Sequence, residues 1–264
     1  MRSDRIQLRQ TFDAVAELYD RARPGYPPAM IDDLAALAGL GPDRRVLEIG
    51  PGTGQLTVPL AERGCRIVAV ELGPMLAEAA RRNLRRFPGV EVVTADFERW
   101  PLPAERFDLV IAATAFHWLD PDTRMGRSAD ALRPGGTLAM VETHHIAGGT
   151  ADFFTRVQDC YLRFDPATPE FTALRPDVEF TSDDGEPRRS GRYQNPTIHR
   201  YEWEQAYTTA EYLDVLRTYS STLDLPAAAA DGLLGCVGGL IDRSFGGRIV
   251  KRYLTRLVLA SRLT

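Results

Sequence analysis

Hydrophobic positions between residues 44 and 143 fall into short runs that alternate with segments of helical spacing. The runs are rich in Val, Ile and Leu, as strands buried on both faces of a sheet are. They lie at 45–49, 66–71, 91–95, 107–112 and 136–142. Helical patterns at 55–63, 74–87 and 121–132 separate them. This alternation predicts an α/β fold, a parallel sheet with helices on both faces.

The remainder of the chain has a different pattern. Two amphipathic helices, within 12–19 and at 29–40, predict a helical lid over residues 1–41. Residues 144–196 are expected to be an inserted segment on the substrate side, with a helix at 147–163 and a Pro-, Asp- and Gly-rich loop at 165–195. Strands at 197–207 and 252–261, with helices at 209–222 and 227–244, complete the C-terminal part, 197–264. We therefore expect a single domain over 1–264, with its core at 44–143.

Composition excludes several classes of protein. Hydrophobic residues make up 44% of the chain and charged ones 26%, as in soluble globular proteins. The net charge of −4 provides no overall attraction to nucleic acid or anionic lipid, so neither is an expected partner. Lys251 is the only lysine beside many arginines, a bias typical of GC-rich bacterial genomes. No secretory or membrane-spanning pattern occurs, and Cys65, Cys160 and Cys236 form no metal motif, so we expect a reducing cytoplasm.

The most informative stretch is the glycine-rich turn at residues 50–54, Gly-Pro-Gly-Thr-Gly, between the first strand and its helix. Glycines at 50, 52 and 54 allow a ligand to approach the main chain closely. A dinucleotide fingerprint would require a further glycine where Gln55 stands, and a phosphate-binding loop would require a lysine. Both phosphate-binding interpretations are therefore weakened.

Acidic residues follow the next two strands. Glu71 ends the second strand, about twenty residues after the first glycine, where a carboxylate can accept both ribose hydroxyls. Asp96 and Phe97 follow the third strand and could hold an adenine ring, although Asp96 could instead cap a local turn. Together with Ala113 after the fourth strand, these residues predict a nucleoside site without phosphates at the carboxyl ends of the strands.

These motifs resemble those of the class I S-adenosylmethionine-dependent methyltransferases. Residues 48–54 are similar to that family's first motif, Glu71 to its ribose acid, and Asp96 and Phe97 to its adenine contact. The segments 107–110 and 133–136 match its fourth and fifth strand entries. The resemblance implies a Rossmann-like, doubly wound, seven-stranded sheet, mostly parallel with the last strand antiparallel. It also implies S-adenosylmethionine as cofactor and S-adenosylhomocysteine as product.

The segments 12–27 and 115–120 resemble the small-molecule branch of the family, which includes trans-aconitate-type enzymes. By that resemblance Tyr19 and Arg23 close over the cofactor, and Arg23 pairs with its carboxylate. The implied cofactor-binding residues are Tyr19, Arg23, Glu48, Gly50, Gly52, Gly54, Gln55, Glu71, Leu72, Met75, Asp96, Phe97 and Ala113.

His117 follows the fourth strand and is the candidate general base, although an ionised acceptor would need no base. His144 and His145 could suggest a metal, but consecutive strand residues point to opposite faces, so no metal site is expected. Tyr201, Trp203 and Tyr207 could line a substrate pocket or simply cover a half-buried strand.

The function that these motifs favour is methyl transfer to an oxygen, nitrogen or carbon of a small-molecule acceptor. A nucleic-acid methyltransferase is an alternative, but the place after the fourth strand reads Ala113-Thr114-Ala115-Phe116 rather than the Asn/Asp-Pro-Pro-aromatic motif of amino-group enzymes. A non-catalytic nucleoside-binding protein is a second alternative. The sequence does not indicate the oligomeric state.

Overall fold

The computed structural model describes residues 13–165, 174, 176 and 185–264. One seven-stranded sheet with the order β3-β2-β1-β4-β5-β7-β6 organises the chain. Strands β1 to β5 pair in parallel, whereas β7 is antiparallel to both β5 and β6. The strands are β1 (Arg45–Ile49), β2 (Arg66–Glu71), β3 (Val90–Thr94), β4 (Phe107–Ala113), β5 (Leu132–His145), β6 (Thr197–Thr208) and β7 (Arg248–Ser261). The predicted Rossmann-like sheet, including its antiparallel last strand, is confirmed.

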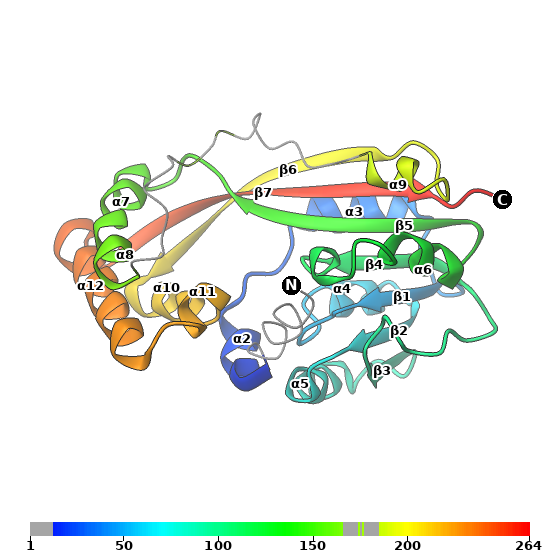
Figure 1. Cartoon of the computed structure of the whole chain (residues 1–264), viewed down its shortest axis with the longest axis horizontal. Coiled ribbons are helices and arrows are strands. Elements are labelled where there is room, and N and C mark those ends of the chain that lie inside the picture. Colours follow the sequence, from blue (N-terminus) through cyan, green and yellow to red (C-terminus); the bar gives the residue numbers. More distant parts are fainter. Residues whose placement is uncertain (1–12, 166–173, 175, 177–184) are drawn as a thin grey trace.

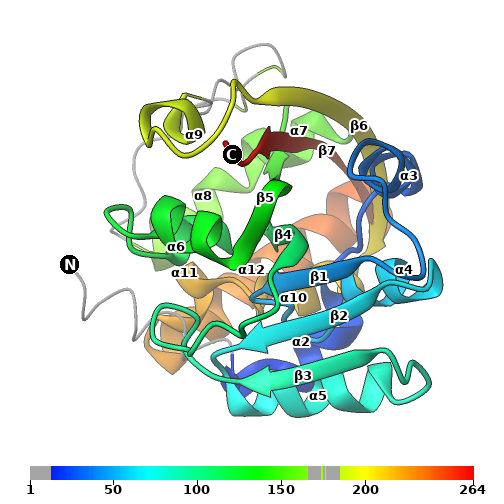
Figure 2. The same ribbon diagram turned by 90° about the vertical axis from the view of Figure 1, so that its right-hand side faces the viewer.

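Both faces of the sheet are covered, because successive strand residues enter different hydrophobic clusters. Val46 packs with the helices α3 (Pro28–Leu37) and α4 (Thr57–Glu62), and its neighbour Leu47 packs with α6 (Arg124–Ala131) on the other face. Helix α5 (Pro74–Leu84) lies along β3, and α3 lies beside β6 and β7 at the opposite edge (Figure 2). This two-sided packing leaves the carboxyl ends of the parallel strands open for a site.

A second body of helices stands at one end of the sheet (Figure 1). We call it the cap, and β5, β6 and β7 carry it because they extend beyond the shorter strands. A third hydrophobic cluster, which includes Phe153, Tyr212 and Ile241, holds the cap together. Its helices are α7 (Ala151–Arg156), α8 (Gln158–Phe164), α10 (Thr209–Leu216), α11 (Ser220–Leu223) and α12 (Ala227–Phe245). Helices α7 and α8 of the inserted segment and the C-terminal helices therefore form one unit.

We call η1 (Asp13–Val15), α2 (Ala16–Ala22) and the following Arg23 the lid. The sequence predicts a longer lid over 1–41, but α3 packs against the sheet and residues 1–12 lie outside the described residues. Asp13 fixes the lid to the core, because its Oδ1 accepts hydrogen bonds from the Met75 and Leu76 N–H groups, at 2.6 and 2.9 Å. Helix α2 contacts α5 of the core and α10 of the cap. The lid thus lies between the two bodies of the molecule.

Several local predictions need correction. The turn expected at residues 133–136 lies inside β5, where Gly135 adopts a φ of 72° and the pairing register with β4 shifts. The helix expected at 147–163 forms two helices, α7 and α8. Within the loop expected at 165–195, α9 (Glu186–Arg189) forms, and much of the rest lies outside the described residues. In the described part of the chain, no helix is long and apolar enough to cross a bilayer.

The cysteines also differ from expectation. Cys160 on α8 and Cys236 on α12 form a disulfide, with 5.8 Å between their Cα atoms, and Cys65 is buried and free. The two residues are 76 positions apart, so spacing gave no signal of their pairing. The disulfide removes the support that the cysteines lent to the expectation of a reducing compartment.

Candidate functional site

A cavity of about 620 Å³ lies at the carboxyl ends of β1, β2 and β4, between the core and the cap. Its volume is within the ordinary range for small-molecule sites. Nine of the predicted cofactor residues line it: Tyr19, Arg23, Gly50, Gly52, Glu71, Leu72, Asp96, Phe97 and Ala113. We call it the cofactor cavity.

The glycine loop forms one wall, and its backbone requires glycine. Gly50, Gly52 and Gly54 have φ of 65°, 60° and 102°, and a Cβ on Gly50 would lie 2.8 Å from that of Ala115. Their N–H groups are already used within the protein: Gly50 donates to the Val70 carbonyl, Gly52 to Glu71 and Gly54 to the Pro51 carbonyl. The loop therefore approaches a ligand closely without offering these three amides to a phosphate.

Glu71 connects two loops below the cavity. Its Oε2 accepts from the Gly52 N–H and its Oε1 from the Gly73 N–H, both at 3.0 Å. Burial raises the pKa of this carboxyl, although the hydrogen bonds from the Gly73 and Gly52 N–H groups lower it. A carboxylate has about four acceptor positions, so each oxygen keeps one for a ribose hydroxyl. The carboxylate can therefore hold both the loop and a ribose.

Asp96 caps a local turn and also lines the cofactor cavity. Its Oδ1 accepts from the Glu98 N–H at 3.0 Å, as a turn-capping residue does, and its side chain also lines the cavity. Phe97 is buried and lines the cavity beside it. The geometry is suited to an adenine ring with its amino group near Asp96.

A second cavity, of about 460 Å³, adjoins the first. Lid, cap and long strands all contribute to its lining. Five residues line both cavities: Tyr19, Arg23, Thr114, Thr143 and Tyr219. We call it the cap cavity. It lies next to the cofactor cavity and beneath the cap.

Thr114 lies at this boundary in a strained conformation. Its φ of 51° is unusual for a β-branched residue. The hydroxyl donates to the Ala113 carbonyl at 2.8 Å and lies 3.3 Å from the Tyr26 hydroxyl, while the N–H donates to the Val141 carbonyl. Backbone strain held by several bonds is common where a chain is shaped around a ligand.

Arg23 uses two of its five guanidinium N–H groups within the protein, so three remain for the predicted pairing with a cofactor carboxylate. Its Nε donates to the Thr218 hydroxyl at 2.8 Å and its Nη2 to the Thr218 carbonyl at 2.7 Å. The guanidinium carbon lies 5.0 Å from the Tyr19 ring centre and 4.7 Å from that of Tyr219. Arg23 thus joins the lid to the cap and supplies positive charge at the junction of the cavities.

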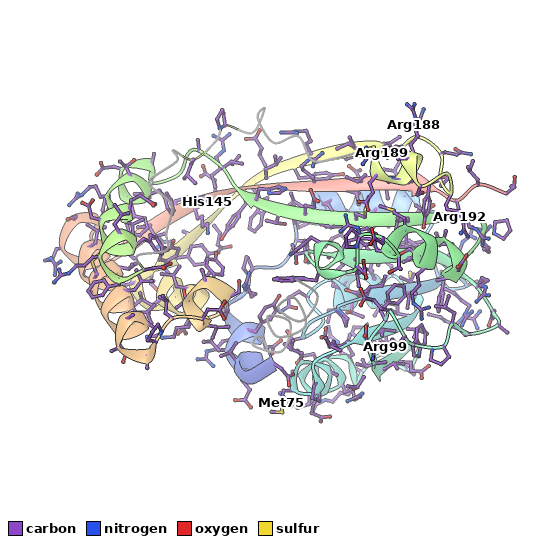
Figure 3. The ribbon with its side chains drawn as sticks, in the orientation of Figure 1. Met75, Arg99, His145, Arg188, Arg189 and Arg192 are labelled. Carbon is purple, nitrogen blue, oxygen red and sulfur yellow. A yellow bond between two sulfur atoms is a disulfide. The ribbon has the colours of Figure 1, made fainter. Side chains whose placement is uncertain are left out.

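The other predicted cofactor residues do not line the cofactor cavity. Gln55 faces the cap cavity, and Gly54 packs its backbone against Leu84 of α5. Met75 is 58% exposed because it follows Pro74 on the outward side of α5, and Figure 3 shows it at the edge of the molecule. Glu48 lies buried beneath the loop, and burial raises its pKa to about 7 despite the nearby Thr57 hydroxyl.

The three histidines near the site occupy different places. His117 is exposed at the rim of the cofactor cavity and is absent from the described lining of the cap cavity. His144 lines the cofactor cavity and His145 the cap cavity, so their predicted divergence is confirmed. Burial and the Lys251 charge lower the pKa of His145 to about 3, so its imidazole is neutral.

Sequence reasoning missed most of the cap cavity. Tyr219, Lys251 and Tyr253 line it, yet none belongs to a motif. The one available signal was that Lys251 is the single lysine among many arginines. Of the aromatic residues singled out on β6, Trp203 and Tyr207 are not lining residues but support the cavity floor. Trp203 stacks on Tyr253, and the Tyr207 hydroxyl lies 2.9 Å from that of Tyr253.

Comparison with known proteins agrees with this geometry. The fold and the loop define a Rossmann-like, nucleoside-binding α/β protein. Residues 47–140 match the family described as a methyltransferase domain. This match, together with the sheet and the glycine loop, supports a class I S-adenosylmethionine-dependent methyltransferase domain, a class whose cofactor is S-adenosylmethionine.

Similarity to individual proteins extends over different lengths. An uncharacterized methyltransferase of Mycobacterium tuberculosis is 38% identical over 141 residues, which are 53% of this chain and 55% of that protein. The chain thus matches about half the length of such curated relatives. A protein of Anaeromyxobacter dehalogenans, proposed to be a type II methyltransferase, has the same fold at 24% identity (TM-score 0.60), covering 91% of this chain and 97% of that one.

A further solved structure with this fold is a Haemonchus contortus phosphoethanolamine N-methyltransferase in complex with S-adenosylhomocysteine and phosphomonomethylethanolamine. It is 15% identical, with a TM-score of 0.55, covering 96% of this chain and 58% of that one. At this identity the likeness concerns the fold alone.

Proposed function

We propose that the chain is an S-adenosylmethionine-dependent methyltransferase that acts on a small molecule held in the cap cavity. The observation that carries the proposal is the pairing of two cavities across Thr114, Thr143 and Tyr219. One has the features of a nucleoside site, and the other is formed by lid, cap and strands. A cofactor and an acceptor in these places would lie next to each other, which is the condition for transfer between them.

The cofactor cavity fits S-adenosylmethionine in shape and charge. The cofactor has no phosphate, and the glycine-loop amides are used within the protein. Glu71, Asp96 and Glu142 line the cavity, an acidic surrounding suited to a sulfonium cation. In this assignment Glu71 accepts from the ribose, Asp96 and Phe97 hold the adenine, and Gly50 and Gly52 lie along the methionine part. Tyr19 closes the cavity from the lid.

When bound, S-adenosylmethionine supplies an electrophilic methyl group, whose carbon–sulfur bond breaks, with its electrons left on sulfur, as the acceptor forms its bond to the methyl carbon. The chain's own contribution is orientation and exclusion of water. Tyr19 and Arg23 from the lid and Tyr219 from the cap close over the junction of the cavities. Such orientation can contribute roughly 7–11 kcal/mol in favourable intramolecular cases.

A small-molecule acceptor is favoured over nucleic acid by the form of the cap cavity. Its described lining comes mainly from the lid, the cap helices and the long strands β5 and β7, with Gln55 and Thr114 from the core, and it includes the buried Lys251. A nucleotide in a strand would have to be flipped into this covered space. His117 stays a candidate base only for an acceptor that approaches from the exposed rim.

Calorimetric titration with S-adenosylhomocysteine tests the cofactor assignment. We expect binding of S-adenosylhomocysteine and none of NAD. Gly52→Val should abolish binding because of its φ of 60° and its contact with Tyr19. Glu71→Ala should weaken binding by about 1–3 kcal/mol through the lost ribose hydrogen bonds. The exposed Met75→Ala serves as the control with unchanged affinity. Binding of NAD alone, or wild-type affinity in Glu71→Ala, would contradict the assignment.

A mass-spectrometric screen with labelled S-adenosylmethionine tests the reaction. The candidate acceptors in the screen are carboxylates, phenols, amines, and RNA and DNA oligonucleotides. Label transfer to a small molecule is the expected result. Transfer only to an oligonucleotide would identify a nucleic-acid enzyme, and cofactor binding without transfer to any candidate acceptor would identify a nucleoside-binding protein.

A further inference from the structure

The cap cavity has an unusual combination of lining residues. Two cations, Arg23 and Lys251, face it, and its described lining contains no Asp or Glu. Aromatic rings form much of the rest: Tyr19, Tyr26, Phe154, Tyr161, Tyr212, Tyr219 and Tyr253. A buried positive charge without a counter-charge is unfavourable unless an anion balances it. The described lining of the cavity therefore carries positive charge that no acidic lining residue balances.

Lys251 is the main source of this charge. It is 5% exposed on β7, and its Nζ donates to the Tyr219 hydroxyl at 2.9 Å. The ammonium also lies 5.2 Å from the ring centres of both Tyr219 and Tyr253. An ammonium has three N–H donors, so a ligand oxygen can be bound beside the hydroxyl.

Tyr219 shows the effect of the two cations on an oxygen in this place. Burial alone would raise the pKa of its phenol, but the charge and hydrogen bond of Lys251, together with the Arg23 charge, outweigh burial and lower it. Tyr219 also lines the cofactor cavity. The junction of the cavities thus stabilises a negatively charged oxygen close to the place where the methyl group would be transferred.

We propose that the cap cavity selects a small aromatic acid, with its ionised oxygen beside Lys251, and that Lys251 is the residue that determines this specificity. The inference rests on the proposed function and narrows its acceptor. Arg23 adds charge from the lid, and the tyrosine rings pack on the flat body of the acid. The two cavities then have complementary charges, acidic around the sulfonium and basic around the acceptor.

An ionised acceptor also accounts for the absence of a strong base among the described residues of this cavity. The oxygen forms a bond to the methyl carbon, the methyl carbon–sulfur bond breaks, and the bonding electrons stay on sulfur. The anion and the sulfonium become a neutral ester, or an ether for a phenolate, and a thioether. No proton has to be removed, so the neutral His145 is not required as a base.

The test uses the fact that Lys251 is the only lysine of the chain. Labelling with ¹³C-lysine gives a single ε-methylene signal that reports on this site in the intact protein. With S-adenosylhomocysteine present, the signal is followed during titration with benzoate, cinnamate and 4-hydroxybenzoate, and with benzamide, cinnamamide and benzylamine. We expect the acids to shift the signal saturably and the amides and amine to leave it in place.

Variants extend the test to affinity, measured by ligand-observed NMR. Lys251→Met should reduce affinity for the acids at least tenfold and leave the amides unchanged, whereas Lys251→Arg should keep the preference for acids. Arg82→Met, which removes a charge from an exposed position of α5, is the matched control. Circular dichroism checks that each variant is folded. If Lys251→Met does not fold, the titration of the labelled wild-type protein decides the question.

Three results would overturn the proposal: a Lys251 signal that no acid moves, equal binding of amides or amine, or an acid preference that persists in Lys251→Met. Calorimetry on the same samples separates this failure from that of the proposed function. If the protein shows no preference for acids but still binds S-adenosylhomocysteine, only the proposal about the acceptor is wrong. Absence of S-adenosylhomocysteine binding overturns the proposed function itself.

Discussion

At the scale of single residues, the site is organised by buried carboxyls below the glycine loop. Glu48 is 1% exposed and Glu71 is 7% exposed, and burial together with the Glu71 charge raises the pKa of Glu48. Glu71 is held by two N–H donors, whereas Glu48 has an Oε2 with no hydrogen-bond partner in the described structure. Protonation of Glu48 is therefore favoured by folding.

This gives a pH prediction for Glu48→Gln. The folded pKa of about 7 lies above the ordinary 4.5, so the stability that Glu48 contributes is present below pH 4.5 and is lost as pH rises to about 7. The difference corresponds to ~3 kcal/mol. Urea unfolding at several pH values should show equal stability of wild type and variant at pH 4.5 and a more stable variant above pH 7. A constant difference between them would contradict this assignment.

At the scale of elements, the cap depends on contacts between helices far apart in the chain. Helix α8 precedes β6 and α12 follows it, yet the Cys160–Cys236 disulfide joins them. Gly232 permits the close approach, because a Cβ there would lie 2.3 Å from the Phe164 ring. A cross-link over 76 residues restricts the unfolded chain strongly.

Replacement of Cys160 by Ser should accordingly lower the free energy of unfolding by about 2–5 kcal/mol. Chemical unfolding under oxidising conditions measures this loss. Reductant should destabilise the wild type and leave Cys160→Ser unaffected. Cys65→Ala, which removes the buried free thiol, is the control that keeps its response to reductant. Equal unfolding midpoints of oxidised and reduced wild type would argue against the disulfide.

At the scale of the whole molecule, three distant segments meet above the two cavities. Arg23 of the lid reaches Thr218 and Tyr219 of the cap, and Asp13 of the lid reaches the start of α5 in the core. The lid is thus the connection through which the cap is placed over the core. Loss of the Arg23 contacts should loosen lid and cap together.

We therefore expect Arg23→Ala to weaken S-adenosylhomocysteine binding about tenfold and to speed hydrogen–deuterium exchange in both 16–23 and 216–223. The control is Arg21→Ala, since Arg21 is exposed and its 3.7 Å ion pair with Asp214 contributes little. Faster exchange in the lid alone would show that Arg23 does not connect it to the cap.

The core could be predicted from sequence because its signals are local. Strand burial, the positive φ of Gly50 and Gly52 and the place of Glu71 after β2 each depend on a few neighbouring residues. Periodicity and glycine spacing record such requirements directly. Met75 shows the limit even there, since motif position did not indicate which way its side chain points.

The sequence by itself thus determined the sheet, the glycine loop and the acidic residues of the cofactor cavity. Only the tertiary structure decided what the cap cavity contains, because Arg23, His145, Tyr219 and Lys251 lie on four separate segments and form no motif. The positive charge that Lys251 and Arg23 place around the Tyr219 oxygen arises from distances through space and from exclusion of water. Neither quantity is recorded in the order of residues along the chain.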